Sequence, residues 1–384
     1  MILEREIFKK IEYYIQKFPI VTLTGVRQCG KTTLLKEKFR DYKYVSLEDI
    51  DIREFAANDP RGFLETYNNK CIFDEVQRVP SLFSYIQTKV DNDKEMGQYI
   101  LSGSHNFLLM EKISQSLAGR VAVLTLTPFS LKELYFNGTE NIGIEDIILK
   151  GFYPAIYARD LLPKEYFNSY VQTYIEKDVR LVKNLTNTNE FIKLIKILAT
   201  RSAQIINYTD IANAANISIP TLKEWISILI QSYIIFELPP YFNNISKRVI
   251  KSPKIYFYDT GLLCYLLNIS TKEDLTENSL FGAIFENLIV SEYLKSRYEK
   301  AEIPEMYFYR DTNQNEIDLI TKEENILSAY EIKASKTMNK NILDKLLKFS
   351  ENIGITKNHS ACIYTGKSIH SENGSFINYA DAFC

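Results

Sequence analysis

Short apolar runs alternate with longer amphipathic segments over the first 160 residues of the chain. The runs lie at Ile20–Thr24, Tyr44–Leu47, Cys71–Phe73, Tyr99–Ser102 and Val121–Leu126. A short apolar run bounded by polar residues is typical of a buried strand, and strands that alternate with helices form a parallel sheet covered on both faces. The pattern therefore predicts an α/β domain over residues 1–160.

The hydrophobic pattern changes twice after this point. A turn-rich stretch begins at Gly151–Pro154, and an apolar stripe at helical spacing follows within residues 165–240. Strand-like runs return at 255–258 and 305–335, on either side of a helical pattern near 280–298. We therefore expect three domains: an α/β domain over 1–160, a helical domain over 161–265 and a small α/β domain over 266–384.

The loop after the first apolar run carries the clearest chemical motif. Residues 25–32 read Gly-Val-Arg-Gln-Cys-Gly-Lys-Thr, which fits G-x-x-x-x-G-K-[ST] between a strand and a helix. Backbone N–H groups of such a loop wrap a polyphosphate, and the following helix N-terminus favours the anion. Lys31 is expected to reach the terminal phosphates and Thr32 to hold Mg²⁺. The predicted nucleotide-binding residues are Gly25, Val26, Arg27, Gln28, Cys29, Gly30, Lys31, Thr32 and Thr33.

Two adjacent acids follow the third apolar run. Asp74 lies 43 residues after Lys31, and Glu75 comes next. In P-loop enzymes an acid at the tip of a neighbouring strand holds Mg²⁺. We assign that role to Asp74 and assign polarisation of the attacking water to Glu75. The second carboxylate favours hydrolysis over mere storage of the nucleotide.

Two further features near the predicted sheet are candidates for contact with phosphate. The strand that begins at residue 98 ends in polar residues, of which Ser102, Ser104 and Asn106 are alternative sensors of the γ-phosphate; Ser104 is the catalytic assignment. Arg120 precedes the next strand, and its planar fork matches phosphate geometry. It is expected to contact a phosphate in the same chain or across a subunit boundary, with a surface salt bridge as the alternative.

These motifs together resemble a known family, the prokaryotic AAA-type ATPases with a C-terminal domain of unknown function. The matching stretches of the first domain are 23–33, 73–77, 101–104, 117–120 and 127–130. Those beyond it are 174–178, 251–257, 259–261, 285–287 and 331–333. One departure is Gly151-Phe-Tyr-Pro154, where the family often has Gly-Gly-aromatic-Pro.

The resemblance implies ATP and Mg²⁺ as cofactors and ATP hydrolysis at Lys31, Thr32, Asp74 and Glu75. It also makes a homo-oligomer plausible, because sites of this class often take an arginine from a neighbouring subunit. We expect hydrolysis to drive movement of the C-terminal domains. An ATP-gated nuclease and a nucleotide switch that recruits a protein partner are the alternatives.

Residues 208–225 predict a helix–turn–helix. Ser218 is a good N-cap, and Pro220 falls in the first turn of the second helix, where its missing N–H costs little. Strand-like segments at 233–240 and 254–258 would complete a winged helix. Its basic residues are Lys247, Arg248, Lys251 and Lys254. Two uses are open: DNA docking, with Thr221, Lys223 and Glu224 near the groove, or packing alone.

The C-terminal domain carries a second set of acids. Glu286 lies in a predicted helix, Asp318 in a strand, and Glu331 and Lys333 two residues apart in the next strand. This is the arrangement of restriction-endonuclease-like folds, in which two acids hold Mg²⁺ and the lysine stabilises charge at the attacked phosphate. We therefore predict that fold, with a second metal site at Asp318 and Glu331. Active cleavage and a structural remnant both remain open.

Composition restricts the class of protein. The chain has 384 residues, 46 % hydrophobic and 24 % charged, with a net charge of −2, so a global basic field is excluded. Five scattered cysteines and three histidines favour neither a zinc site nor a disulfide framework. No apolar run approaches the roughly 20 residues that span a bilayer, and the N-terminus does not resemble a secretory signal. We expect a cytoplasmic protein without a membrane partner.

Overall fold

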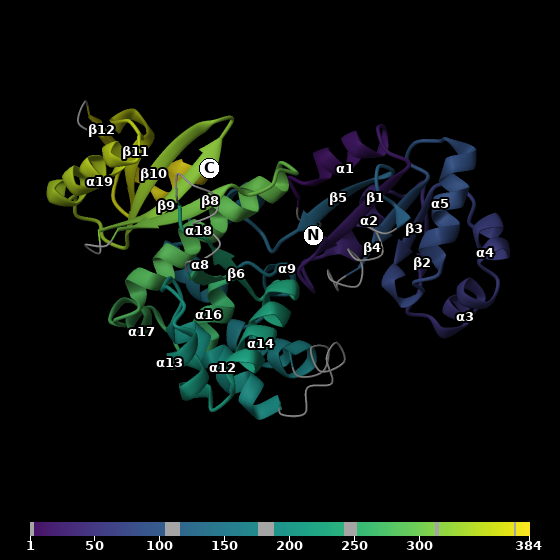
Figure 1. The fold of residues 1–384 in the computed structure, drawn as a ribbon, viewed down its shortest axis with the longest axis horizontal. Helices are drawn as coiled ribbons and strands as arrows, with labels where there is room; N and C mark the ends of the chain where they lie inside the picture. The colour runs from purple at the N-terminus through teal and green to yellow at the C-terminus, as the bar shows by residue number, and fades with distance from the viewer. Residues whose placement is uncertain (1–3, 104–115, 176–187, 242–251, 312–314, 372–373) are drawn as a thin grey trace. The chain divides into compact units, whose positions relative to one another are not determined.

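The computed structural model describes residues 4–103, 116–175, 188–241, 252–311, 315–371 and 374–384 (Figure 1). The chain divides into two compact units. The first consists of residues up to Phe129 together with the short segments Gln231–Tyr233 and Arg297–Glu302, and the second contains the remainder.

The first unit is built on a parallel sheet. Its five strands have the order β2-β3-β4-β1-β5, and every neighbouring pair is parallel. The strands are β1 (Ile20–Gly25), β2 (Lys43–Ser46), β3 (Cys71–Asp74), β4 (Tyr99–Ser102) and β5 (Val121–Leu126). Each coincides with one of the five apolar runs, so the prediction of a parallel α/β sheet is confirmed.

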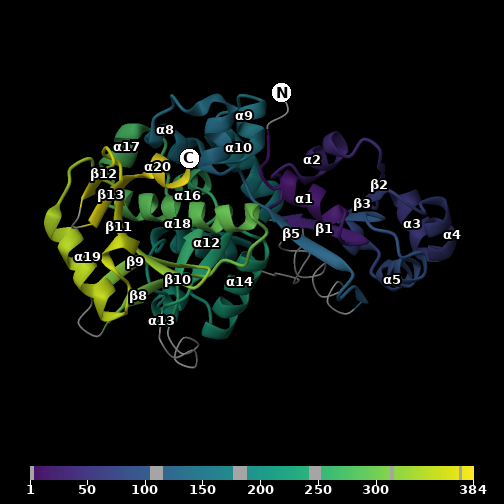
Figure 2. The ribbon, with the colours of Figure 1, turned by 90° about the horizontal axis from the view of Figure 1, so that it is seen from above.

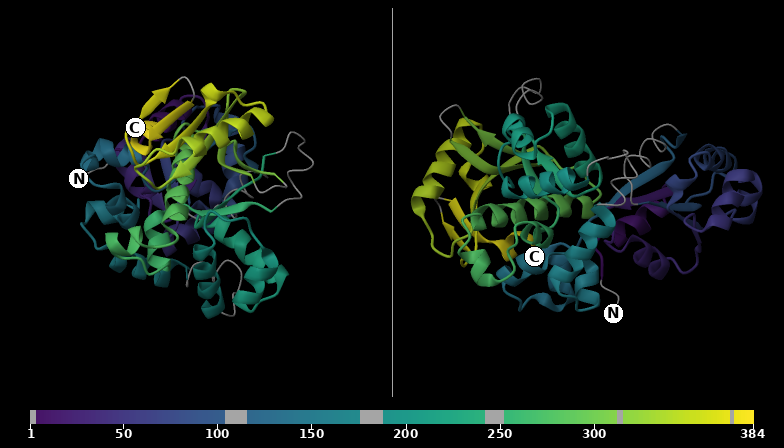
Figure 3. Two further views of the ribbon diagram at one scale, coloured as in Figure 1. Left: turned by 90° about the vertical axis from the view of Figure 1, so that its left-hand side faces the viewer. Right: turned by 90° about the horizontal axis from the view of Figure 1, so that it is seen from below.

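The central strands β1, β3 and β4 are buried at every position because this sheet is covered by helices. The helices are α1 (Phe8–Ile15), α2 (Lys31–Lys38), α3 (Ile50–Asn58), α4 (Pro60–Thr66) and α5 (Leu82–Asp93). Phe63 of α4 and Phe83 of α5 pack with Phe73 and Tyr99 of the sheet in one apolar core. Figure 3 shows this unit, purple to blue, from two further sides.

The second unit begins with helices. They are α7 (Leu131–Leu134), the π-turn η2 (Tyr135–Thr139), α8 (Ile144–Lys150), α9 (Pro154–Ala158), α10 (Pro163–Tyr170), η3 (Val171–Ile175), α12 (Thr188–Thr200), α13 (Tyr208–Ala215) and α14 (Ile219–Gln231). An antiparallel pair, β6 (Ile235–Leu238) and β7 (Lys254–Phe257), precedes α16 (Thr260–Leu266), α17 (Lys272–Thr276) and α18 (Phe281–Glu299). A helical part therefore follows the parallel sheet, as expected.

The segment predicted as a winged helix has two helices and a two-stranded sheet. Helices α13 and α14 are joined through Asn216, which is left-handed at φ 60°. Whether this is a winged helix stays a prediction, and Lys247, Arg248 and Lys251 lie outside the described residues. The expectation that Lys254 contacts DNA phosphates is wrong for this structure, because its side chain is 2 % exposed and paired with carboxylates.

A mixed sheet ends the second unit, with the order β12-β13-β11-β10-β9-β8. Its strands are β8 (Met306–Arg310), β9 (Glu316–Glu323), β10 (Ile326–Lys333), β11 (Ser360–Tyr364), β12 (Ile369–Ser371) and β13 (Gly374–Asn378). Helix α19 (Lys340–Asn352) buries Leu343 and Leu346 against this sheet, and α20 (Tyr379–Phe383) follows the last strand. Helix α18 runs beside the sheet (Figure 2), where Tyr293 contacts Tyr330 of β10. A mixed sheet with flanking helices is thus present in the C-terminal region, while the boundaries of the three expected domains stay a prediction.

A close backbone approach joins the Gly-Phe-Tyr-Pro turn to the start of α16. Asp259 caps that helix by accepting from the backbone N–H of Leu262 at 2.7 Å, and it also accepts from the N–H of Phe152 at 2.7 Å. Gly151 has φ +73°, and a Cβ there would lie 2.6 Å from Asp259 Oδ1. The turn therefore requires glycine for both its conformation and its packing.

Replacing Gly151 by alanine is expected to destabilise the second unit by at least about 2 kcal/mol, because a left-handed conformation and a buried carboxylate contact are both strained. Thermal unfolding of the variant should show a lower midpoint than that of the parent. Gly282→Ala is the matched control, since a Cβ at Gly282 meets nothing within 4 Å. Equal midpoints for parent and Gly151→Ala would contradict this packing.

Candidate functional site

The phosphate loop joins β1 to α2 through two glycines that no other residue can replace without strain. A Cβ on Gly25 would lie 2.0 Å from the carbonyl oxygen of Leu126, and Gly30 has φ +93°. Lys31, the first residue of α2, donates to the carbonyl oxygens of Gly25 at 3.0 Å and Val26 at 2.8 Å. The ammonium group of Lys31 thus lies inside the curve of the loop, with 7 % of the residue exposed.

Asp74 ends β3 beside this loop. Its Oδ2 accepts from Thr32 Oγ1 at 2.8 Å and from the hydroxyl of Tyr44 at 2.6 Å, and its Oδ1 accepts from Ser102 Oγ at 2.5 Å. Burial and the hydrogen bond to Asp74 raise the pKa of Tyr44, so its hydroxyl remains a donor at neutral pH. The fold therefore brings the two predicted Mg²⁺ residues, Thr32 and Asp74, into direct contact.

Glu75 has an unusual backbone and a close partner. It is left-handed at φ 54°, between β3 and the 3-10 turn η1 (Val76–Arg78). The side-chain amide of Gln77, a residue only 7 % exposed, donates to the Glu75 carboxylate. The tight turn after β3 and the Gln77 amide together fix the direction of this carboxylate.

Tyr44 and Gln77 are residues of this site to which the sequence analysis gave no role. The contact of Tyr44 with Asp74 depends on the pairing of β2 with β3, in which Ser46 lies opposite Asp74. The sequence does not give this strand order. Gln77 belongs to the Asp-Glu-Val-Gln motif, and its position two residues after Glu75 was the available signal.

Ser104 and Arg120 are the other two residues predicted to be catalytic. Ser104 and the alternative Asn106 lie outside the described residues. Arg120 directly precedes β5, whose register pairs Ile20 with Val121. Arg120 therefore lies at the end of the sheet where β1 begins. The phosphate loop follows the opposite end of β1, about 17 Å away at 3.3 Å per residue.

Arg120 is bound at that end of the sheet by a two-pronged ion pair with Asp91. Arg120 Nε lies 2.5 Å from Asp91 Oδ1, and Nη2 lies 2.8 Å from Oδ2. The expectation that Arg120 contacts a phosphate of its own chain is therefore wrong, because Arg120 and the phosphate loop lie at opposite ends of β1. Contact across a subunit boundary stays a proposal.

The acids of the C-terminal sheet come together. The register of β9 with β10 places Asp318 beside Glu331, and Asp318 Oδ2 accepts from the backbone N–H of Ile332 at 2.8 Å. Lys333 Nζ lies 2.7 Å from Glu331 Oε1 and 3.4 Å from Asp318 Oδ2. Both carboxylates therefore contact one ammonium group, as residues two apart on a strand allow.

Glu286 approaches from α18 but is occupied by other partners. It accepts from Lys254 Nζ at 2.9 Å and from the hydroxyl of Tyr256 at 2.7 Å, and Lys254 Nζ also lies 2.5 Å from Glu316 Oε1. Burial raises the pKa of Glu286 to about 7 and that of Glu331 to about 7.

Lys254 and Lys333 supply positive charge beside the carboxylates of the C-terminal sheet and α18. Within the described part of the chain, no group of three or more His, Cys, Asp or Glu residues is placed to hold a metal ion. The metal-binding role of Asp318 and Glu331 therefore stays a prediction, although the side chains do converge.

The fold and the first site define a class of protein. The strand order, the phosphate loop between β1 and α2 and the acid pair at the tip of β3 are those of a P-loop NTPase. The family described as an AAA domain matches residues 17–135, and domains of unknown function match residues 142–273 (DUF8612) and 281–381 (DUF4143). The resemblance to AAA-type ATPases with a C-terminal domain of unknown function is confirmed.

Several known proteins are similar to this chain. The uncharacterized protein Rv2008c of Mycobacterium tuberculosis is 26% identical over 341 residues, which cover 88% of this chain and 75% of that protein. The uncharacterized protein MJ1637 of Methanocaldococcus jannaschii is 26% identical over 303 residues, 65% of this chain and 63% of that protein. The Walker-type ATPase paby2304 of Pyrococcus abyssi has 15% identity, covers 69% of this chain and 96% of its own, and superposes with a TM-score of 0.47.

Over the described residues, no helix has both the length and the apolar character needed to cross a bilayer.

Proposed function

We propose that the chain binds MgATP at the phosphate loop and hydrolyses it, and that hydrolysis drives movement of its C-terminal domains. The observation that carries this proposal is the hydrogen bond between Thr32 and Asp74, 42 residues apart in the sequence. It places the hydroxyl and the carboxylate of the two motifs side by side. A hydroxyl and a carboxylate are oxygen ligands of the kind that Mg²⁺ accepts.

Each residue of the site has a distinct task in this proposal. The loop N–H groups and Lys31 neutralise the phosphates, with Lys31 exchanging its loop carbonyl partners for phosphate oxygens. Thr32 and Asp74 would hold the Mg²⁺ that neutralises developing charge on the nucleotide. Glu75 accepts the proton of the attacking water. Gln77 orients Glu75, and Tyr44 orients Asp74.

Two partners form part of this proposal, a neighbouring copy of the chain and DNA. Arg120 would act on the nucleotide of a neighbouring copy, which makes a homo-oligomer the active form. The C-terminal domains would move on DNA. ATP hydrolysis is tested by phosphate release from MgATP, measured for the parent chain and for the Lys31→Ala and Glu75→Gln proteins.

Metal-dependent cleavage of DNA is the second candidate function, and the observation that favours it is the convergence of Asp318, Glu331 and Lys333. If it operates, Mn²⁺ or Mg²⁺ would replace the lysine contacts when DNA is bound. Cleavage of a plasmid should then disappear in the Asp318→Ala protein and persist in Asp344→Ala, an exposed control in α19. Cleavage that survives in Asp318→Ala, or that the parent lacks, would exclude this candidate.

A further inference from the structure

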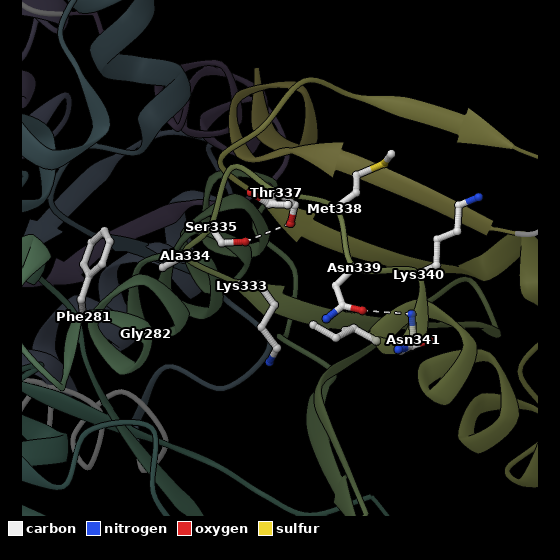
Figure 4. A pocket seen from close by; sticks show the side chains of 11 residues that line it. Phe281, Gly282, Lys333, Ala334, Ser335, Thr337, Met338, Asn339, Lys340 and Asn341 are labelled. Carbon is white, nitrogen blue, oxygen red and sulfur yellow. Dashed lines mark hydrogen bonds between the residues drawn. The ribbon is translucent and has the colours of Figure 1, made fainter.

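A groove of about 620 Å³ opens where β10 leads into α19. One wall is the loop that joins these two elements, and the other is the start of α18 (Figure 4). Its polar side chains are those of Lys333, Ser335, Thr337, Asn339, Lys340 and Asn341. The lining residues all belong to the second unit, and Lys333 is shared with the cluster of Asp318 and Glu331.

The loop along this groove is basic and carries no acid. Residues 332–343 contain three lysines and no aspartate or glutamate. Lys336 and Lys340 are exposed, and neither forms an ion pair with a carboxylate of the described residues. The surplus continues beyond the groove, since residues 331–367 contain seven lysines and three acids.

The loop also has hydrogen-bond donors held in fixed positions. Asn339 Oδ1 accepts from the backbone N–H of Asn341 at 3.1 Å, which orients the side-chain amide. Ser335 Oγ donates to the carbonyl oxygen of Thr337 at 3.1 Å, which braces the loop. Lysines together with hydroxyl and amide donors are the groups that bind phosphate oxygens of nucleic acids.

We propose that this groove binds the phosphodiester backbone of duplex DNA. Single-strand sites rely on aromatic side chains that stack on bases, and Phe281 is the single ring among the described lining residues. A free phosphate would fill only part of the groove. The exposed lysines continue to Lys345 and Lys348 along α19, a helix of 13 residues that is about 20 Å long.

The test is duplex binding without nucleotide and with EDTA, so that neither ATP hydrolysis nor metal-dependent cleavage affects the result. Fluorescence anisotropy of a labelled 20-base-pair duplex is measured with the full chain from about 50 to 200 mM KCl. The double variant Lys336→Glu, Lys340→Glu should bind at least about tenfold more weakly. Its plot of log affinity against log salt should be less steep by about two units.

Two matched variants make this result specific. Lys193→Glu, Lys196→Glu makes the same charge change on exposed positions of α12 and should bind within about twofold of the parent. Lys223→Glu tests whether the duplex binds helix α14 instead, the second helix of the predicted helix–turn–helix. Both exposed-lysine doubles should keep the parent's thermal unfolding midpoint.

The outcomes separate the proposal from its rivals. It is overturned if the parent does not bind the duplex at 50 mM KCl, if Lys193→Glu, Lys196→Glu weakens binding as much as the groove double variant, or if only Lys223→Glu weakens it. Inorganic phosphate at about 10 mM should compete no better than its ionic strength predicts; stronger competition would assign the groove to a small phosphate anion instead.

Discussion

Glu75→Gln protein is expected to bind MgATP with near-parent affinity and to release phosphate at least about 100-fold more slowly. A neutral amide cannot accept the proton of the attacking water, and general base catalysis contributes roughly 10²–10⁴-fold to such rates. The substitution preserves the shape of the side chain and its hydrogen-bonding reach toward Gln77. Steady-state phosphate release and equilibrium nucleotide binding, measured on the same preparation, check both halves of the prediction.

Glu65→Gln is the matched control for this variant. Glu65 is an exposed glutamate of α4 in the same unit, and the same chemical change there should leave turnover unaltered. Near-parent turnover in the Glu75→Gln protein would remove Glu75 from the catalytic role. Loss of nucleotide binding in that protein would instead show that Glu75 acts on the loop itself.

Lys31→Ala protein is expected to lose ATP affinity by about 10- to 100-fold. Hydrogen bonds to charged groups contribute about 1.5–3 kcal/mol each, and each 1.4 kcal/mol corresponds to a factor of ten. The effect should be larger for ATP than for AMP, because Lys31 is expected to contact the terminal phosphates. Titration of both nucleotides into parent and variant measures this difference.

Lys36→Ala provides the control within the same helix. Lys36 is exposed in α2, and its ammonium group lies 3.8 Å from the ring centroid of Tyr44 rather than in the phosphate loop. Its loss should leave ATP affinity within about twofold of the parent. An equal loss of affinity for ATP and AMP in Lys31→Ala would indicate a collapsed loop rather than a lost phosphate contact.

The parallel sheet was predictable because its strands are buried on both faces. β1 is buried at all six of its positions, and such strands appear in the sequence as continuous apolar runs. The spacing of Gly25, Gly30 and Lys31 was informative for a related reason. A loop that wraps phosphate leaves little choice of residue at its turns, so the motif is visible without the structure.

The contacts that the sequence could not reveal are those between distant segments. Tyr44 reaches Asp74 only because β2 lies next to β3, a strand order that local patterns do not contain. Lys254 appears in the sequence as one more basic residue near a predicted wing. Its burial becomes evident only from its pairing with Glu286 and Glu316, on α18 and β9.

The C-terminal acids make one contact that the sequence predicts and one that it does not reveal. The two-residue spacing of Glu331 and Lys333 on a strand correctly indicated that they share a face. The competing lysine partner of Glu286 was not visible, since it comes from β7. Convergence of acids could therefore be predicted from sequence, but the charges that neutralise them could not.

Hydrolysis of ATP with Glu75 as the base is tested most directly by following the bound nucleotide. The parent and Glu75→Gln proteins are incubated with MgATP labelled on the γ-phosphate and on the base, and the protein-bound nucleotides are recovered and separated. Intact ATP is expected on the Glu75→Gln protein, and ADP with released phosphate is expected from the parent. ADP formed at the parent's rate by Glu75→Gln, or no nucleotide retained by either protein, would contradict ATP hydrolysis with Glu75 as the base.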